Sequence, residues 1–497
     1  MPVLTPGTPF VSADPVITVE GLGPGTHRFR LEVEDDAGNR SAPDERTVVV
    51  RAAAPAITDI KPRFGAWGDE VVIVGTGFDP EPAKNKVSFA NGVGTAVTAA
   101  SATELRVRVP QPAVTGPVTV STANGQAQSG FPFVIPVTFV MKPGGTGLTD
   151  LAAEPRRKEL WVSHVAVGAA ANVGALSVLD LGTRTLAATV AAQQGPREVA
   201  ATVVADRPMA VLANGQASTV TLVDAASRTL ITHVKVRALP SGVAFRPDSD
   251  RFIYVVCQVD ATGGAGGVDV IDTQDRPRVV ARIELGRQPQ RVVFSPDSKL
   301  AFVNESADGT VAVIDAQAHK LLKHVPVGGT GSTRVASTPT DVAVAPRTGF
   351  PALTANAGNG SVSLIDDGLN VKDVDVGAPV SAVAVDADGR LGWAAGPEER
   401  VVFAVNLASA AAKKLAVSAP ANGPKSVVAQ VGGRGVFVAH PGGAAVTVFD
   451  AKGGLRAVVP VPDAPTRGVC TPDGSLACFI CTKAGVVVAI DVASVLA

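Results

Sequence analysis

Short apolar segments rich in Val, Ile, Leu and Ala alternate with polar turns along most of this chain of 497 residues. From about residue 143 onward one order repeats: an apolar strand, a polar turn, a second strand, a Gly- or Asn-rich connection, and a β-branched strand that closes on Asp or Asn. The closing residues are Asp180, Asp224, Asp272, Asp315, Asp366, Asn406, Asp450 and Asp491. Their spacing of about 44 residues is typical of β-propeller blades, each made of four antiparallel strands. The pattern therefore predicts an all-β chain with a propeller over residues 136–497.

The last repeat has only three strands, because no fourth apolar segment follows Asp491. Residues 137–141 precede the first repeat and have the pattern of an outer strand. Pairing the two ends of the repeat region would leave no free strand edge. We therefore predict eight blades of four strands, with residues 137–141 completing the last blade. Seven blades are the alternative, since the first repeat is irregular.

Two of the repeats carry a family pattern. Pro247-Asp248-Ser249 precedes the strands at residues 253–256 and 268–272, and Pro296-Asp297-Ser298 precedes those at residues 301–304 and 310–315. These segments resemble the YVTN-type propellers, which are found largely in bacterial and archaeal surface and secreted proteins. The resemblance covers about residues 137–497 and implies the fold, but no single activity, because that family hosts many functions.

Residues 53–135 have a different pattern. Val71 and Ile73, then Val87 and Phe89, alternate with polar residues, as in strands with one face in a core. With Pro55, Pro62, Gly65, Gly75, Gly77, Phe78 and Gly116-Pro117, they resemble an IPT/TIG domain. The resemblance spans a whole domain and implies an immunoglobulin-like sandwich.

Residues 1–52 resemble only the final strands of a PKD or fibronectin type III sandwich, on residues 24–33 and 47–50. A complete sandwich of that kind needs about 100 residues. Half a sandwich leaves an apolar face and unpaired backbone groups, so something must cover it. We expect the cover to come from a protein partner or an oligomer contact, with the neighbouring domain as the alternative. The expected assembly anchor is formed by Phe29, Leu31, Val33, Val48 and Val50.

Net charge, the length of apolar runs and the number of cysteines exclude several classes of function. Lys plus Arg number 44 and Asp plus Glu 45, a net charge of -1, so an electrostatic nucleic-acid binder is not expected. No apolar run is long enough for a membrane span, and the first residues show no secretory signal. The four cysteines are too few for a disulfide scaffold. We expect buried free thiols, with a Cys470–Cys478 bridge as the alternative.

Few residues have the spacing that catalysis or metal binding requires. The six histidines show neither His-x-x-x-His nor a 2-His-carboxylate pattern. No nucleophile elbow or phosphate loop is present, and Cys481 is followed by Thr482 rather than the His of a haem-attachment motif. No catalytic residue, metal site or cofactor is therefore predicted.

The long connections indicate one candidate surface. In an antiparallel blade with strands A to D, the B–C and D–A connections lie on the same face of the ring, and the longest Gly-rich connections here are of these two kinds. Loops on a rigid scaffold commonly carry binding. The alternative is that loop length simply drifts on this face. The candidate interaction residues are His164, Asn172, Asp260, Glu305, Asp308, Arg334, Asn356, Asn359 and His440.

These observations favour a non-enzymatic binding or structural protein that presents a propeller as a protein-interaction platform, alone or within an oligomer or larger assembly. Two settings are open: a bacterial surface or secreted adhesin-like protein, and an accessory component of a phage-tail-like contractile injection particle. The location is accordingly extracellular, cell-surface or particle-associated. The alternative class is an enzyme of lactonase or hydrolase type that uses the central channel.

Overall fold

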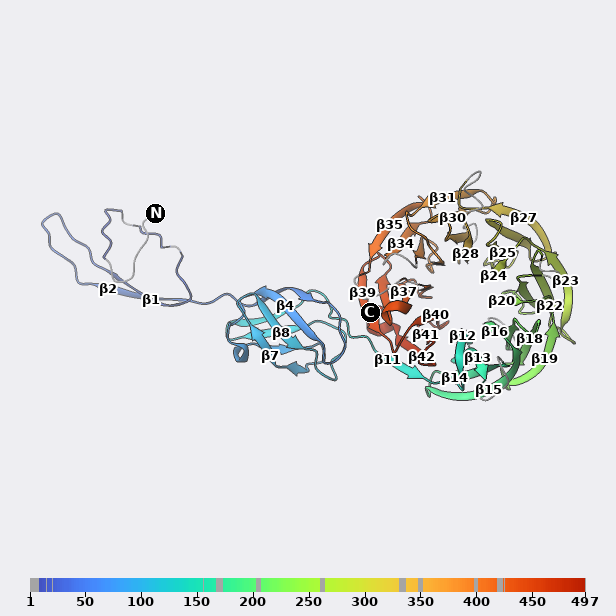
Figure 1. Ribbon diagram of the computed structural model, residues 1–497. Coiled ribbons are helices and arrows are strands. Elements are labelled where there is room, and N and C mark those ends of the chain that lie inside the picture. Colours follow the sequence, from blue (N-terminus) through green and yellow to red (C-terminus); the bar gives the residue numbers. More distant parts are fainter. Residues whose placement is uncertain are drawn as a thin grey trace. The chain divides into compact units, whose positions relative to one another are not determined.

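The structure is a computed structural model that describes residues 9–496, except 15, 20, 155, 167–172, 203–206, 260–263, 330–336, 347–351, 397–400, 418–422 and 424. The chain divides into two compact units, residues 1–135 and 136–497 (Figure 1). Each unit is described by itself below.

The first unit begins with an isolated hairpin. Strand β1 (Gly25–Leu31) pairs antiparallel with β2 (Asp44–Val50), and these two strands form a sheet of their own. None of the described residues before Pro55 is buried. This hairpin therefore has no core of its own, as expected for a two-stranded sheet.

The rest of the first unit is a β-sandwich of two four-stranded sheets, ordered β3-β4-β8-β7 and β10-β9-β5-β6. The bounds are β3 (Ala56–Lys61), β4 (Glu70–Thr76), β5 (Lys86–Ser88), β6 (Gly94–Thr95), β7 (Val97–Ala100), β8 (Glu104–Arg108), β9 (Thr119–Thr122) and β10 (Gly125–Gln128), with the 3-10 helix η1 (Pro82–Lys84) between β4 and β5. Val71, Ile73, Val87 and Phe89 are all buried in its core, where Phe89 stacks edge-on against Phe133. The alternation in the sequence thus identified the buried faces of these strands.

The second unit is a propeller in which the described residues form eight four-stranded sheets (Figure 1). Blade one comprises β12 (Gly145–Glu154), β13 (Glu159–Ala166), β14 (Val173–Asp180) and β15 (Thr185–Gln194); blade two β16 (Pro196–Ala201), β17 (Met209–Asn214), β18 (Thr219–Asp224) and β19 (Thr229–Lys235); blade three β20 (Pro240–Phe245), β21 (Phe252–Cys257), β22 (Gly267–Asp272) and β23 (Arg278–Glu284); blade four β24 (Pro289–Phe294), β25 (Leu300–Glu305), β26 (Thr310–Asp315) and β27 (Lys320–Pro326). Blade five comprises β28 (Pro339–Val344), β29 (Ala352–Asn356), β30 (Ser361–Ile365) and β31 (Val371–Asp375); blade six β32 (Ala382–Val385), β33 (Leu391–Ala395), β34 (Val401–Asn406) and β35 (Ala411–Ala416); blade seven β36 (Ser426–Ala429), β37 (Gly435–His440), β38 (Ala445–Asp450) and β39 (Leu455–Pro460), with η3 (Pro441–Gly443); blade eight β40 (Pro465–Cys470), β41 (Leu476–Cys481) and β42 (Val486–Asp491) with β11 (Thr138–Met141).

The ring closes as the repeat pattern predicted. Strand β11 pairs antiparallel with β42 and becomes the outer strand of blade eight, in the order β11-β42-β41-β40. Met141 of β11 is buried in the apolar cluster between blades eight and one. Eight blades, rather than seven, are therefore formed.

The first strand of each blade lies innermost and contacts the first strand of the next, from β12 round to β40 and back to β12 (Figure 1). Apolar clusters fill the spaces between successive blades. The aspartates that close the third strands start the next turn, as Asp180 shows: its Oδ1 accepts the backbone N–H groups of Gly182 and Thr183 at 2.8 Å each. These hydrogen bonds lower the pKa of Asp180.

The four cysteines are free and buried, so the Cys470–Cys478 bridge does not form. Cys470 instead lies opposite Ala477 in the strand pair β40–β41. Among the described residues, no helix is long and apolar enough to cross a membrane.

Candidate functional site

The antiparallel order of the strands places the B–C and D–A connections of every blade on one side of the ring, which we call the B–C face. The connections at residues 165–174, 258–267 and 328–339 lie partly outside the described residues, and so do the candidates Asn172, Asp260 and Arg334. The turn after β29 is described, and Asn359 is exposed there. Asp308 is partly exposed in the turn between β25 and β26.

Four of the predicted interaction residues are fully buried: His164, Glu305, Asn356 and His440. Three of these side chains bond to hydroxyl groups on the third strand of their own blade. The pairs are His164 Nε2 with Ser177 Oγ at 2.7 Å, Asn356 Nδ2 with Ser363 Oγ at 2.8 Å, and His440 Nε2 with Thr447 Oγ1 at 2.7 Å. These residues hold second and third strands together just beneath the B–C face.

The same polar positions also join neighbouring blades. The backbone N–H of Gly144 donates to Ser177 Oγ, and the N–H of Gly328 donates to Ser363 Oγ, both at 2.9 Å. Each of these donors lies in the connection that enters the blade from the preceding outer strand. These buried hydrogen bonds tie the scaffold together under the face, although Asn356 Oδ1 and His440 Nδ1 have no hydrogen-bond partner among the described residues.

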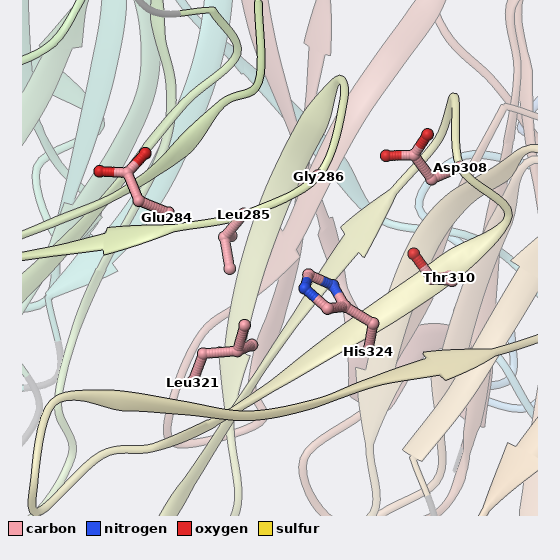
Figure 2. Close-up of a pocket in the computed structure, with 7 residues that line it drawn as sticks. All are labelled: Glu284, Leu285, Gly286, Asp308, Thr310, Leu321 and His324. Carbon is pink, nitrogen blue, oxygen red and sulfur yellow. The ribbon is translucent and has the colours of Figure 1, made fainter.

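An open pocket of about 430 Å³ lies on the outer side of the junction between blades three and four (Figure 2). Its lining residues are Glu284, Leu285, Gly286, Asp308, Thr310, Leu321 and His324. Gly286 and Asp308 belong to D–A and B–C connections, so one end of the pocket is at the B–C face. The two leucines belong to the apolar cluster between these blades.

Glu305 lies beneath this pocket and accepts three hydrogen bonds. Its donors are the Gly286 N–H at 2.5 Å, the Thr310 hydroxyl at 2.5 Å and His324 Nδ1 at 2.8 Å. The carboxylate at Nδ1 selects the tautomer with the proton on that nitrogen, which leaves Nε2 as an acceptor. The His324 side chain is 44 % exposed, and Figure 2 shows its ring among the other lining residues.

A second polar site, which the sequence reasoning missed, lies on the first strands. One equivalent position carries charged side chains in five blades: Asp150, Glu198, Arg291, Asp341 and Arg467. The signal was present in the sequence, because this position follows a Pro-x pair and precedes Val in β16, β24 and β28.

Each acid of this inner ring bonds to the next blade. Asp150 Oδ2 accepts the Val199 N–H, Glu198 Oε2 the Val243 N–H, and Asp341 Oδ2 the Val383 N–H, all at 3.1 Å. These bonds join the innermost strands directly around the ring.

Arg291 contacts two of the acids, Asp341 and Glu198, and a glycine occupies the equivalent position of the blade between Glu198 and Arg291. Its Nη1 donates to Asp341 Oδ1 at 3.0 Å, and its Nε lies 3.6 Å from Glu198 Oε1. Blade three, which lies between Glu198 and Arg291, has Gly242 at the equivalent position. A Cβ there would lie 3.0 Å from Glu198 Oε2 and 2.5 Å from the Gln290 carbonyl oxygen. The glycine thus makes room for this ion pair.

Burial shifts the ionisation of the ring. Desolvation raises the pKa of Glu198 to about 7; the Arg291 charge opposes this rise and the Asp150 charge adds to it. Desolvation also raises the pKa of Asp150. The charge of Asp341 raises the pKa of Arg291, which stays charged. A carboxyl that titrates near neutral pH can act as a general acid or base when a substrate reaches it.

Comparison with protein families assigns both folds. The IPT/TIG domain model matches residues 55–139, and the model "Cytochrome D1 heme domain" matches residues 204–350. The chain therefore carries an IPT/TIG immunoglobulin-like domain followed by a β-propeller. Folds of these two classes support protein interaction.

Two solved structures are similar to this chain. The Kuenenia stuttgartiensis hydrazine synthase chain is 20% identical, with 58% of this chain and 97% of that chain covered and a TM-score of 0.45. Staphylococcus aureus virginiamycin B lyase is 10% identical, with 60% and 94% covered and a TM-score of 0.46. No curated protein matches this chain.

The match to a haem domain raises the question of whether this propeller fits haem. Protein ligands to haem iron are His, Cys, Met or Tyr. The equivalent inner-ring positions hold Asp, Glu, Arg, Gly, Ala and Ser instead. In the matched segment, His233 and His324 lie on the outer strands β19 and β27, and His319 hydrogen-bonds to the Tyr254 hydroxyl at 2.7 Å. The described residues therefore do not fit an axial haem site at the inner ring. Nor do they include three His, Cys, Asp or Glu side chains grouped to hold a metal ion.

Proposed function

We propose that this protein is a non-enzymatic binding and structural protein. Its N-terminal hairpin joins it to a larger assembly, and the B–C face of its propeller binds a protein partner. The two settings that fit are a bacterial surface or secreted adhesin-like protein and an accessory component of a phage-tail-like contractile injection particle. The observation that carries the proposal is the exposure of apolar side chains such as Leu31 and Val48 on one face of the hairpin, which no other described residue buries.

The register of the hairpin defines that face. Because cross-strand partners point to the same side, the pairs Gly25–Val50, His27–Val48, Phe29–Arg46 and Leu31–Asp44 place Phe29, Leu31, Val48 and Val50 on one face. Leu31 is 58% exposed and Val48 43%, and Val33, beyond the end of β1, is 61% exposed. The same face also carries the ion pair Arg46–Asp44, and the opposite face carries the ion pair Arg28–Glu45. An amphipathic two-stranded sheet of this kind is stable only when a partner covers it.

Two variants with matched chemistry test the anchor. Leu31→Asp places a charge on the apolar face and is expected to abolish co-purification with the assembly or self-association measured by light scattering. Val49→Asp is the control, because Val49 is 63% exposed on the opposite face. Equal behaviour of the two variants would contradict the proposal. In an isolated monomer, we also expect fast hydrogen exchange across residues 29–33 and 47–50; strong protection there would mean that the hairpin needs no partner.

A second candidate function is favoured by one specific observation. Glu198 and Asp150 are neighbouring acids whose pKa values are raised by burial, and a carboxyl that titrates near neutral pH can serve as a general acid or base. An enzyme of lactonase or hydrolase type would act at the inner ring. Incubation with a panel of lactones and glycosides, with divalent metals added, is the test. Turnover that Glu198→Gln abolishes would replace the binding proposal; absence of turnover in the whole panel would count against the enzyme.

A further inference from the structure

The pocket between blades three and four contains a buried carboxylate that lacks a strong cationic partner. The two carboxylates that line the pocket have arginine partners: Glu284 pairs with Arg237, and Asp308 pairs with Arg287. Glu305 differs, because its only ion-pair partner among the described residues is His324. Its other two donors are the neutral Gly286 N–H and Thr310 hydroxyl. When His324 is neutral, all three donors to this fully buried carboxylate are neutral, and such a carboxylate favours a further positive charge nearby.

His324 is the pocket residue through which such a charge would interact with Glu305. In the neutral imidazole with Nδ1 donating to Glu305, Nε2 is an acceptor, and the side chain is 44 % exposed in the pocket. A cationic N–H group that donates to Nε2 would be coupled through the ring to the Glu305 carboxylate. The pocket lining contains no Lys or Arg, so no residue of the lining already takes this place.

The pocket walls fit an amphipathic side chain. Leu285 and Leu321 supply apolar surface from two different blades, and Thr310 and Asp308 supply oxygen atoms on the same side as the B–C connection (Figure 2). Lys and Arg bury an aliphatic stem while keeping a charged end hydrogen-bonded. An acidic group would instead meet Glu284, Asp308 and Glu305.

We infer that this pocket receives the side chain of a Lys or Arg residue of a protein partner, with its charged end donating to Nε2 of His324. The inference rests on the proposed function and specifies the partner's chemistry at one point of the B–C face. Glu305 acts here as a positioning residue, because it fixes the orientation and tautomer of His324 without touching the ligand.

The test uses the full chain with methyl-labelled leucines, observed by NMR during titration with Nα-acetyl-lysine methylamide. The matched probe is Nα-acetyl-norleucine methylamide, which has the same stem without the ammonium group. We expect the lysine probe to shift the Leu285 and Leu321 methyl signals saturably, with an apparent affinity about tenfold or more above that of norleucine. Equal shifts with both probes, or none with either, would overturn the inference.

A variant pair separates recognition from general effects on the fold. His324→Asn keeps a donor near the Nδ1 position but removes Nε2, so it is expected to eliminate the preference for lysine over norleucine. His233 occupies the equivalent position of β19 in blade two and bonds Thr221 instead of a carboxylate, so His233→Asn should leave the preference intact. Unchanged preference in His324→Asn would refute the inference.

Cross-linking of a partner distinguishes failure of the lysine pocket from failure of the proposed function. If a partner cross-links to the B–C face with equal yield in the chain and in His324→Asn, the platform stands and the lysine pocket does not. If the lysine probe binds but no partner cross-links to that face, the pocket stands and the platform fails.

Discussion

Glu198 makes the stability of the propeller depend on pH in a direction that can be measured. Its pKa is raised from about 4.5 to about 7, mainly by burial in the inner ring. In the unfolded chain the same group loses its proton near pH 4.5. Between about pH 4.5 and 7 the native state therefore binds more protons than the unfolded state, and the free energy of unfolding falls as pH rises. The stabilising contribution of the protonated form is complete below pH 4.5 and is lost as pH rises through 7.

The magnitude follows from the size of the shift. One pKa unit corresponds to about 1.4 kcal/mol, so a shift of about 2.5 units makes the carboxyl cost about 3 kcal/mol once it is ionised. Glu198→Gln removes the titration but keeps an oxygen acceptor for the Val243 N–H. We expect the variant to gain about 3 kcal/mol relative to the parent chain between pH 4.5 and pH 7.5.

Urea unfolding of the propeller at several pH values between 4.5 and 7.5 measures this difference. Groups that titrate in both proteins, including the buried histidines, cancel in the comparison. Glu284→Gln is the control for the chemistry of the substitution itself, because the Glu284 side chain is 76% exposed. A constant difference between Glu198→Gln and the parent across this range would refute the assignment of Glu198 as a buried carboxyl that titrates near neutrality.

Three further predictions concern other parts of the propeller. Burial lowers the pKa of His440 to about 4, so its neutral form contributes stability above pH 6.5 that is lost as pH falls toward 4. His440→Gln should remove about 3 kcal/mol of that loss in the same unfolding assay, and parallel curves would contradict it. Deleting residues 1–136 should leave a folded ring, whereas deleting residues 1–142 also removes β11, exposes the edge of β42 and should lower the thermal midpoint by several degrees; equal midpoints would argue against this closure. Burial raises the pKa of Cys257, Cys470, Cys478 and Cys481, so a thiol reagent should label few groups in the native protein and about four after denaturation, while rapid native labelling of Cys478 would be inconsistent with its strand position.

The inner ring shows what the sequence left undetermined. Asp150, Glu198, Arg291 and Arg467 are far apart along the chain, and each lies on a strand that carries at least one other polar residue. Only closure of the ring brings them together, and the raised pKa of Glu198 arises from that burial. The ion pair between Glu198 and Arg291 also requires Gly242 on a third strand between them. No local pattern encodes such a three-blade relation.

The candidate residues of the B–C face also show what local sequence could not predict, because residues expected at the surface are buried. His164, Asn356 and His440 lie next to connections rich in Gly and Asn, so in the sequence they read as surface loop residues. The structure buries them, and a hydroxyl group on the adjacent third strand bonds to one polar atom of each side chain. Whether a polar side chain at the end of a strand faces solvent or a neighbouring strand depends on the register of the next strand.

The sequence by itself determined the architecture, because its signals are local and repeated. Alternation such as Val71 and Ile73 marks the face of a strand that a core must cover, and the closing aspartates recur at the spacing of a four-stranded blade. The same logic predicted that residues 137–141 complete blade eight, since an open edge would be costly. Tertiary structure decided which polar residues meet, which of them are buried, and where a pocket opens. Those properties depend on distances between blades, and short-range patterns along the chain do not contain them.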